Sequence, residues 1–208
     1  MVDINDSSMK MPKTAKSART RQNILDAACK LIEERGCADF QMLEVAKRCN
    51  MSKGALYYYF EDREELVEEI LSQQLDSFVD ELEKGIKESS DPEGALHSLC
   101  MAFAQTVSSQ NSVVSTIAME LVRGGRDTLE RVSARFDRIN DLIAQQIELG
   151  KKEGLVRSDV DSKFLSYCVS GTFFFAAFNN SSINGMKMDG IKLADELMDY
   201  IAHGIATY

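Results

Sequence analysis

The sequence predicts an all-α protein with a small N-terminal helix-turn-helix head and a larger C-terminal helical body, about nine helices in all. Apolar residues recur at helical spacing through most of the 208 residues, and only two prolines interrupt them. No segment shows the strict alternation of a half-buried strand. We expect a flexible polar tail at 1–16, the head at 17–61 and the body at 62–208.

The first head helix is predicted from an apolar face that repeats every three or four residues, and Gly36 ends it. That face consists of Ile24, Ala27, Ala28, Leu31 and Ile32. A shorter helix at 41–48 turns Met42, Val45 and Ala46 inward. Residues 49–51 then make a tight turn before the third helix.

Residues 51–66 are the most informative segment of the chain. Ser52 is a good N-cap for a short helix that starts at Lys53, and Gly54 leaves one face of that helix bare. Three tyrosines at 57–59 stand about 100° apart on a helix, so at least one of them must face outward. Asp62 and Glu65 then have the spacing of a capping box. This order of helices is typical of a helix-turn-helix, whose last short helix lies in the DNA major groove.

Residues 19–66 resemble the DNA-binding domain of the TetR (tetracycline repressor) family of bacterial regulators. The matching residues are Arg21, Ile24-Leu25, Ala27-Ala28, Gly36, Val45-Ala46, Ser52-Lys53-Gly54, Leu56-Tyr57, Tyr59-Phe60, Glu64 and Leu66. The chain departs from the family pattern at Gln41, where threonine is usual, at Asn50, where glycine is usual, and at Arg63, where lysine is usual. We expect Gln41 to weaken the cap of its helix and Asn50 to tolerate a left-handed backbone.

The resemblance implies a dimeric, cytoplasmic, ligand-responsive transcription regulator, most often a repressor, that binds a double-stranded DNA operator. It places Lys53, Gly54, Ala55 and Tyr58 toward base edges. The full predicted DNA-binding set is Gln41, Lys47, Ser52, Lys53, Gly54, Ala55, Tyr57, Tyr58, Tyr59 and Arg63. Tyr57, Tyr59 and Arg63 are expected on phosphates, although Tyr57 could instead close the small core of the head. Lys13, Lys16 and Arg19 either follow the groove or belong to a solvated tail.

Charge is divided unevenly along the chain. Residues 10–60 carry ten Lys and Arg against five Asp and Glu, a net charge of +5, whereas residues 61–208 carry fourteen against twenty-six, a net charge of −12. Asp3 and Asp6 complete the total of −9. The basic part coincides with the head, as a DNA footprint requires, although a chance division of charge would look the same.

The body is predicted as helices at 62–88, 92–109, 113–123, 126–153, 160–182 and 188–206. Gly124-Gly125 and Gly154 are the expected breaks. The last two helices are too apolar to stand alone, so they form either a monomer core or an intersubunit bundle. The resemblance favours a homodimer interface that contains Phe173, Ala176, Leu197 and Ile201.

The resemblance also implies a pocket for a small-molecule effector among the middle helices of the body. Candidate lining residues are Phe103, Val107, Met119, Phe136, Ile139, Tyr167, Phe174 and Asn179. Plain core packing is the alternative for each of them. The sequence does not specify the class of effector.

Two alternative functions are a redox-sensing regulator and a small all-α enzyme. A redox-sensing regulator would use Cys100 or Cys168, although the five cysteines suit a reducing cytoplasm and lack metal-like spacing. A small all-α enzyme is disfavoured, because His97 and His203 are far apart and no nucleophile, phosphate or zinc motif occurs. We therefore expect no catalytic site, metal site or cofactor. No apolar run has the length of a membrane span, and the N-terminus lacks a signal-peptide core.

Overall fold

The computed structural model describes residues 13–108, 113–181 and 189–205, and side chains within these ranges except at 13–14, 107–108, 113–118, 121, 124–129, 131, 177–181 and 201–205. The described residues form eight helices and no strand, which confirms the all-α prediction. The helices are α1 (Lys13–Arg35), α2 (Met42–Arg48), α3 (Lys53–Tyr57), α4 (Arg63–Glu88), α5 (Pro92–Ser108), α6 (Val113–Lys152), α7 (Ser162–Ser181) and α8 (Gly190–Ile205).

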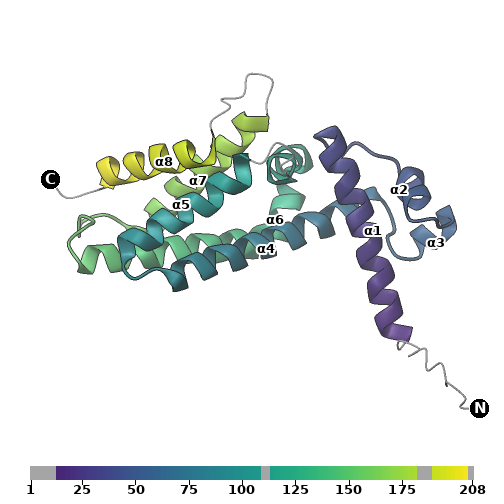
Figure 1. Cartoon of the computed structure of the whole chain (residues 1–208), viewed down its shortest axis with the longest axis horizontal. Helices are drawn as coiled ribbons and strands as arrows, with labels where there is room; N and C mark the ends of the chain where they lie inside the picture. The colour runs from purple at the N-terminus through teal and green to yellow at the C-terminus, as the bar shows by residue number, and fades with distance from the viewer. Residues whose placement is uncertain (1–12, 109–112, 182–188, 206–208) are drawn as a thin grey trace, which may run out of the picture.

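The molecule is elongated, with the head of α1–α3 at one end and the body of α4–α8 at the other (Figure 1). Helix α4 leaves the head directly after α3 and runs into the body, where α5 and α6 lie along it. Helix α7 packs mainly on α6, and α8 packs on α5. Helix α4 therefore carries the chain from the head into the body.

The turns of the head follow from single residues. Gly36 adopts a left-handed backbone with φ +66°, and its N–H donates to the carbonyl of Ile32 at 2.8 Å, which ends α1. Asn50 has φ +51°, as predicted for a residue that replaces glycine in the turn. The Ser52 hydroxyl accepts the N–H of Ala55 at 3.2 Å and caps α3.

Carboxylates cap two helices of the body. Asp62 accepts the N–H of Glu65 at 2.7 Å, which confirms half of the predicted capping box. The other half is shifted by one residue, because the Glu65 carboxylate accepts the N–H of Glu61 at 2.6 Å. Asp91 accepts the N–H of Gly94 at 2.7 Å just ahead of α5 and so caps that helix.

Buried side chains form two hydrophobic cores, one in the head and one in the body. The head core joins α1, α2 and α3 to the first half of α4, and it includes the fully buried Val132 from α6. The body core joins the second half of α4 to α5–α8. Phe136 and Phe174 are half-buried and pack against both cores, so the body touches the head through a small apolar junction.

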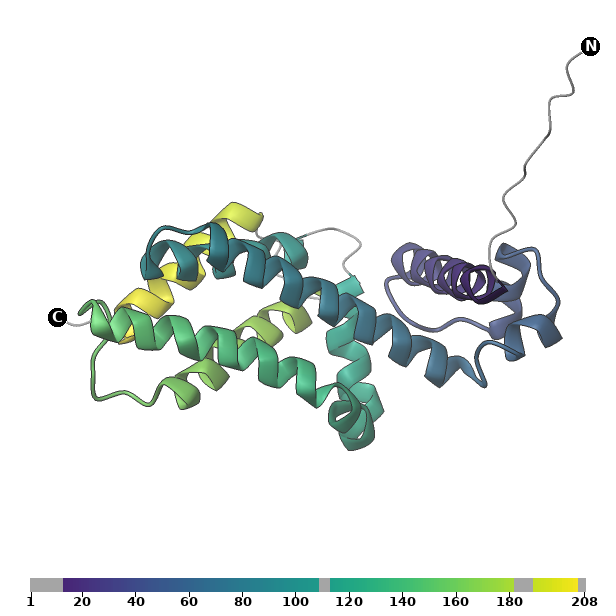
Figure 2. The same ribbon diagram turned by 90° about the horizontal axis from the view of Figure 1, so that it is seen from below.

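Two predictions about element boundaries are wrong. The expected helices 113–123 and 126–153 are one helix, α6, which passes through Gly124-Gly125. Glycine costs only about 1 kcal/mol per residue in a helix, and packing of the flanking segments outweighs that cost. The ribbon instead bends sharply in the first half of α6 (Figure 2), and glycine pairs commonly allow such kinks. Helix α1 also starts at Lys13, inside the predicted tail. The merger of the two expected helices into α6 gives eight helices in the described residues, against about nine expected.

Two predicted dimer-interface residues lie in the core of the single chain. Phe173 is 6% exposed, and its ring stacks on Phe103 with centroids 4.2 Å apart. Leu197 is also buried, and Ala176 is half-buried against the body core. The side chain of Ile201 lies outside the described residues. Helical periodicity predicts that a face is apolar but not which neighbour covers it, and here α5 covers that part of α8.

Candidate nucleic-acid interface

Helix α3 has one buried side and one exposed side. Leu56 and Phe60 are fully buried and anchor this segment in the head core. On the other side Tyr58 is 81% exposed and Tyr57 is 41% exposed. Tyr59 is half-buried against the head core, so the alternative of a core tyrosine describes Tyr59 better than Tyr57.

The exposed side of α3 presents hydroxyls, one ammonium and a bare backbone. A Cβ added at Gly54 would meet no atom within 4 Å, so the backbone there is open to close approach. Lys53 is exposed, and its ammonium lies 5.5 Å from the centroid of the Tyr57 ring. The rings of Tyr58 and Tyr59 meet edge-on with centroids 5.3 Å apart. Such a surface can donate hydrogen bonds to phosphate oxygens and to acceptors on base edges.

Helix α2 supplies the remaining candidates. Gln41 and Lys47 are both exposed, and Gln41 has the extended backbone of an N-cap residue. Its N–H donates to the Glu44 carboxylate at 2.8 Å, which compensates for the loss of the usual threonine. Among the described residues, Lys47 and Lys53 make no ion pair, so their charges are available to a polyanion.

Two ion pairs fasten α2 to the end of α1. The Arg35 guanidinium lies 2.5 Å from the Glu44 carboxylate, and Arg48 pairs with Glu34. The hydrogen bond from Arg35, followed by that from the Gln41 N–H, lowers the pKa of Glu44 to about 2. These contacts help to hold α2 in place against α1.

Arg63 has a structural partner that the sequence did not reveal. Its guanidinium donates to the carbonyl of Ala38, in the segment between α1 and α2, and it pairs with Glu64 at 3.5 Å. The side chain is 28% exposed. A contact between Arg63 and phosphate stays a prediction, and it must share the guanidinium with these partners.

The structure places the predicted effector-pocket residues in several different environments. Phe103 and Ile139 are buried in the body core, and Phe136 and Phe174 form the junction with the head core. Met119 is 36% exposed and Tyr167 is 49% exposed. The side chains of Val107 and Asn179 lie outside the described residues. Core packing therefore accounts for four of the eight candidates.

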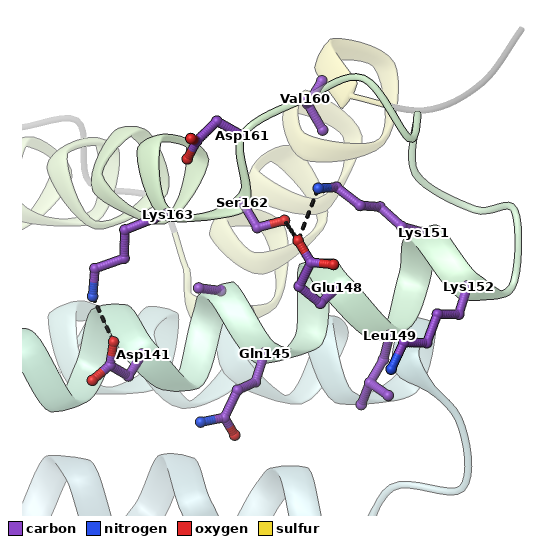
Figure 3. Close-up of a pocket in the computed structure, with 11 residues that line it drawn as sticks. Asp141, Gln145, Glu148, Leu149, Lys151, Lys152, Val160, Asp161, Ser162 and Lys163 are labelled. Atoms are coloured by element: carbon purple, nitrogen blue, oxygen red, sulfur yellow. Dashed lines mark hydrogen bonds and ion pairs between the residues drawn. The ribbon is translucent and has the colours of Figure 1, made fainter.

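An open groove lies elsewhere in the body, between the second half of α6 and the start of α7 (Figure 3). Lys163 pairs with Asp141 at 2.5 Å, and Glu148 accepts from Lys151 at 2.9 Å and from Ser162. The acids and lysines of this groove neutralise one another. It therefore presents no net charge to an anionic ligand.

The cysteines do not support a redox sensor. Burial raises the pKa of Cys29 to about 11 and that of Cys100 to about 12, and it also raises the pKa of Cys49. A thiol with a raised pKa holds less of the reactive thiolate at neutral pH. Cys168, the other candidate, is exposed on α7.

Two family models together match almost the whole of the chain that the structure describes. The model of the bacterial regulatory proteins of the tetR family matches residues 24–70, and that of the C-terminal region of YsiA-like proteins matches residues 71–204. The chain belongs to the tetR family. The match begins within α1 and reaches into α4, so it contains the whole helix-turn-helix described above.

Individual relatives of this tetR-family chain are regulators. It is 29% identical over 152 residues to the transcriptional repressor KstR2 of Rhodococcus jostii, covering 71% of this chain and 72% of that protein. The structure of the regulator FadR from Bacillus subtilis in complex with stearoyl-CoA superposes with a TM-score of 0.77 at 18% identity, over 88% and 98% of the two chains. That of AibR in complex with isovaleryl coenzyme A and operator DNA gives 0.66 at 21% identity, over 86% and 96%.

Two other kinds of site are absent from the described ranges. None of the helices there is long and apolar enough to span a membrane. Likewise, no group of three or more His, Cys, Asp or Glu residues in those ranges is arranged to hold a metal ion.

The Arg35–Glu44 pair predicts a specific acid sensitivity of the head. Because the pKa of Glu44 is lowered on folding, its stabilising effect is fully present above an unfolded-state pKa of about 4.3 and is lost as the pH falls toward about 2. Glu44→Gln should therefore be less stable than the wild type at pH 6, and the difference should shrink by pH 3. Urea unfolding followed by circular dichroism measures it. Arg35→Gln should behave alike, and a pH-independent difference would contradict the assignment.

Proposed function

We propose that this chain is a cytoplasmic, effector-responsive transcriptional repressor that binds a palindromic DNA operator as a homodimer and performs no enzymatic reaction. The head binds the operator through α2 and α3, which contact its bases and its phosphates. A small molecule bound by the body shifts the heads and releases the DNA. The boundary between the DNA-binding head and the ligand-binding and dimerisation body lies after residue 61, just ahead of the start of α4.

The observation that carries the proposal is the two-sided character of α3. Leu56 and Phe60 hold it in the head core, whereas Lys53, Gly54 and Tyr58 project into solvent, where they make no contribution to that core. Exposed aromatic residues beside lysines on a net basic head suit a polyanionic duplex. The tetR-family membership and a relative solved with operator DNA support the same function.

The homodimer is supported by an exposed apolar face on α7. Phe164 is 65% exposed and Phe175 is 62% exposed, and between them lie the exposed Cys168 and Gly171. A Cβ at Gly171 would meet nothing within 4 Å, so a second helix has room to approach there. A two-fold axis would pair this face with itself and place two heads on successive half-sites.

The effector class is proposed from two structures of similar fold. One holds stearoyl-CoA and the other isovaleryl coenzyme A, which are both acyl thioesters of coenzyme A. The body of this chain offers an acyl group an aromatic interior, with Phe78, Phe103 and Phe173 in successive ring contact. We propose that an acyl-CoA opens this interior and thereby strains the junction at Phe136 and Phe174.

The DNA proposal predicts different outcomes for two lysines of equal charge. Lys53→Ala should relax the preference at one or two base pairs, each worth about 1–3 kcal/mol. Lys47→Ala should weaken binding on all sequences alike and reduce the salt slope by about one. A selection from random duplexes followed by binding titrations measures both. If Lys53→Ala leaves every base preference intact, its base-reading role is wrong.

The interface predicts opposite behaviour for two neighbouring phenylalanines of α7. Phe175→Asp places a charge in the proposed interface and should give folded monomers with much weaker operator binding. Phe173→Ala empties part of the body core and should cost about 3–5 kcal/mol of unfolding free energy. Light scattering and urea unfolding separate the two effects. A Phe175→Asp variant that stays dimeric would exclude this face as the interface.

The effector proposal predicts reciprocal coupling. Stearoyl-CoA at about one hundred times its dissociation constant should stabilise the protein by about 2.7 kcal/mol. It should also lower the affinity for a selected duplex, and that duplex should lower the affinity for stearoyl-CoA by the same factor. Coenzyme A without an acyl chain is the control. Binding of stearoyl-CoA with no change in DNA affinity would leave the body without a sensing role for this class.

A further inference from the structure

Arg21 of α1 makes an unusual number of contacts for one side chain of the head. Its Nε donates to both carboxylate oxygens of Glu69 at 3.0 Å, and its Nη2 contacts Glu69 and, at 3.4 Å, Glu65. Its Nη1 donates to the carbonyl of Tyr59 at 2.5 Å. The guanidinium carbon also lies 4.1 Å from the centroid of the buried Phe60 ring.

These contacts join α1, the end of α3 and the start of α4, which also pack together in the head core. The carbonyl of Tyr59 lies just past the end of α3, whereas Glu65 and Glu69 lie on the first two turns of α4. Glu65 also accepts the N–H of Glu61 at 2.6 Å. One guanidinium therefore fixes both sides of the α3–α4 connection, directly at Tyr59 and through Glu65 at Glu61.

Only a guanidinium can make this set of contacts. Arginine has a planar fork of donors, so one side chain can bind a carboxylate with two nitrogens and a carbonyl with the third while its face lies on a ring. Lysine carries the same charge on a single nitrogen and cannot span Glu69 and Tyr59 in this way. An Arg21→Lys variant therefore removes the geometry and keeps the net charge of the head.

The orientation of α3 matters more for base recognition than for phosphate contacts. Base recognition requires side chains to be held within about 0.5 Å of their productive positions, whereas phosphate contacts position the protein without reading sequence. We propose that Arg21 is a positioning residue for base reading, which sets the angle between α3 and α4 without touching DNA. This inference rests on the proposed DNA-binding function and assigns a role within the same site.

The experiment compares two duplexes with the full-length chain. One duplex is the sequence that the wild-type protein enriches from a random library, and the other is a scrambled version of it. Arg21→Lys should bind the enriched duplex about tenfold more weakly and the scrambled duplex within about twofold of the wild type. It should also flatten the base preference at all positions that α3 reads, whereas Lys53→Ala flattens only one or two.

The matched control is Arg138→Lys. Arg138 contacts Glu83 of α4 with Nε at 2.9 Å and Nη2 at 2.6 Å, but this pair lies in the body. This variant should bind both duplexes within about twofold of the wild type. If Arg138→Lys loses as much discrimination as Arg21→Lys, the effect is general to contacts on α4 and the proposal is wrong.

Three further outcomes would overturn the proposal. They are an equal loss on both duplexes, no loss on either, and a salt slope reduced by about one, which would mark a direct phosphate contact. If Arg21→Lys loses helix content at the assay temperature, Glu69→Gln should show the same selective loss to a smaller extent, and a uniform loss there would overturn it too. Failure of the wild type to enrich any sequence would contradict the DNA-binding function itself.

Discussion

The rest of the structure depends on one constraint, which is that one long helix, α4, supplies several buried side chains to each of the two hydrophobic cores. Leu66, Ile70 and Leu75 of α4 lie in the head core, and Val79 and Leu82 lie in the body core. The 26 residues of α4 span roughly 39 Å, so neither core can shift without moving a rigid rod shared with the other. A change in the packing of the body is thereby transmitted to the segment that carries α3.

Helix α3 has only five residues, so its stability depends on the rest of the head. An isolated helix of that length is not stable in water, since nucleation costs more than its few hydrogen bonds return. The helix is stabilised by contacts with its surroundings. These are the Ser52 cap, the burial of Leu56 and Phe60 in the head core, and the hydrogen bond from Arg21 to the carbonyl of Tyr59. The exposed surface of α3 is therefore only as rigid as these supports.

Local rules predicted the head well, since caps, breaks and buried faces depend on residues close in sequence. Ser52, Asp62, Gly36 and Asn50 all do what their types predict. Predictions that required knowledge of distant partners did less well. The sequence marked Phe173 and Leu197 as apolar but could not show that the same chain buries them. Nor could it show that Arg63 contacts Ala38, or that α6 continues through two glycines that packing outweighs.

The separation between the two sides of α3 has a consequence for evolution. Lys53, Gly54 and Tyr58 make no core contact, and surface substitutions of this kind usually change stability by no more than about 0.5 kcal/mol. Duplicated copies of such a gene are therefore free to acquire new operators by single mutations. The aromatic interior at Phe103 and Phe173 lacks that freedom, because each change there must be compensated by its neighbours. With α3 and this interior in the roles proposed above, descendants of this protein should diverge in the DNA they recognise sooner than in the molecules they sense.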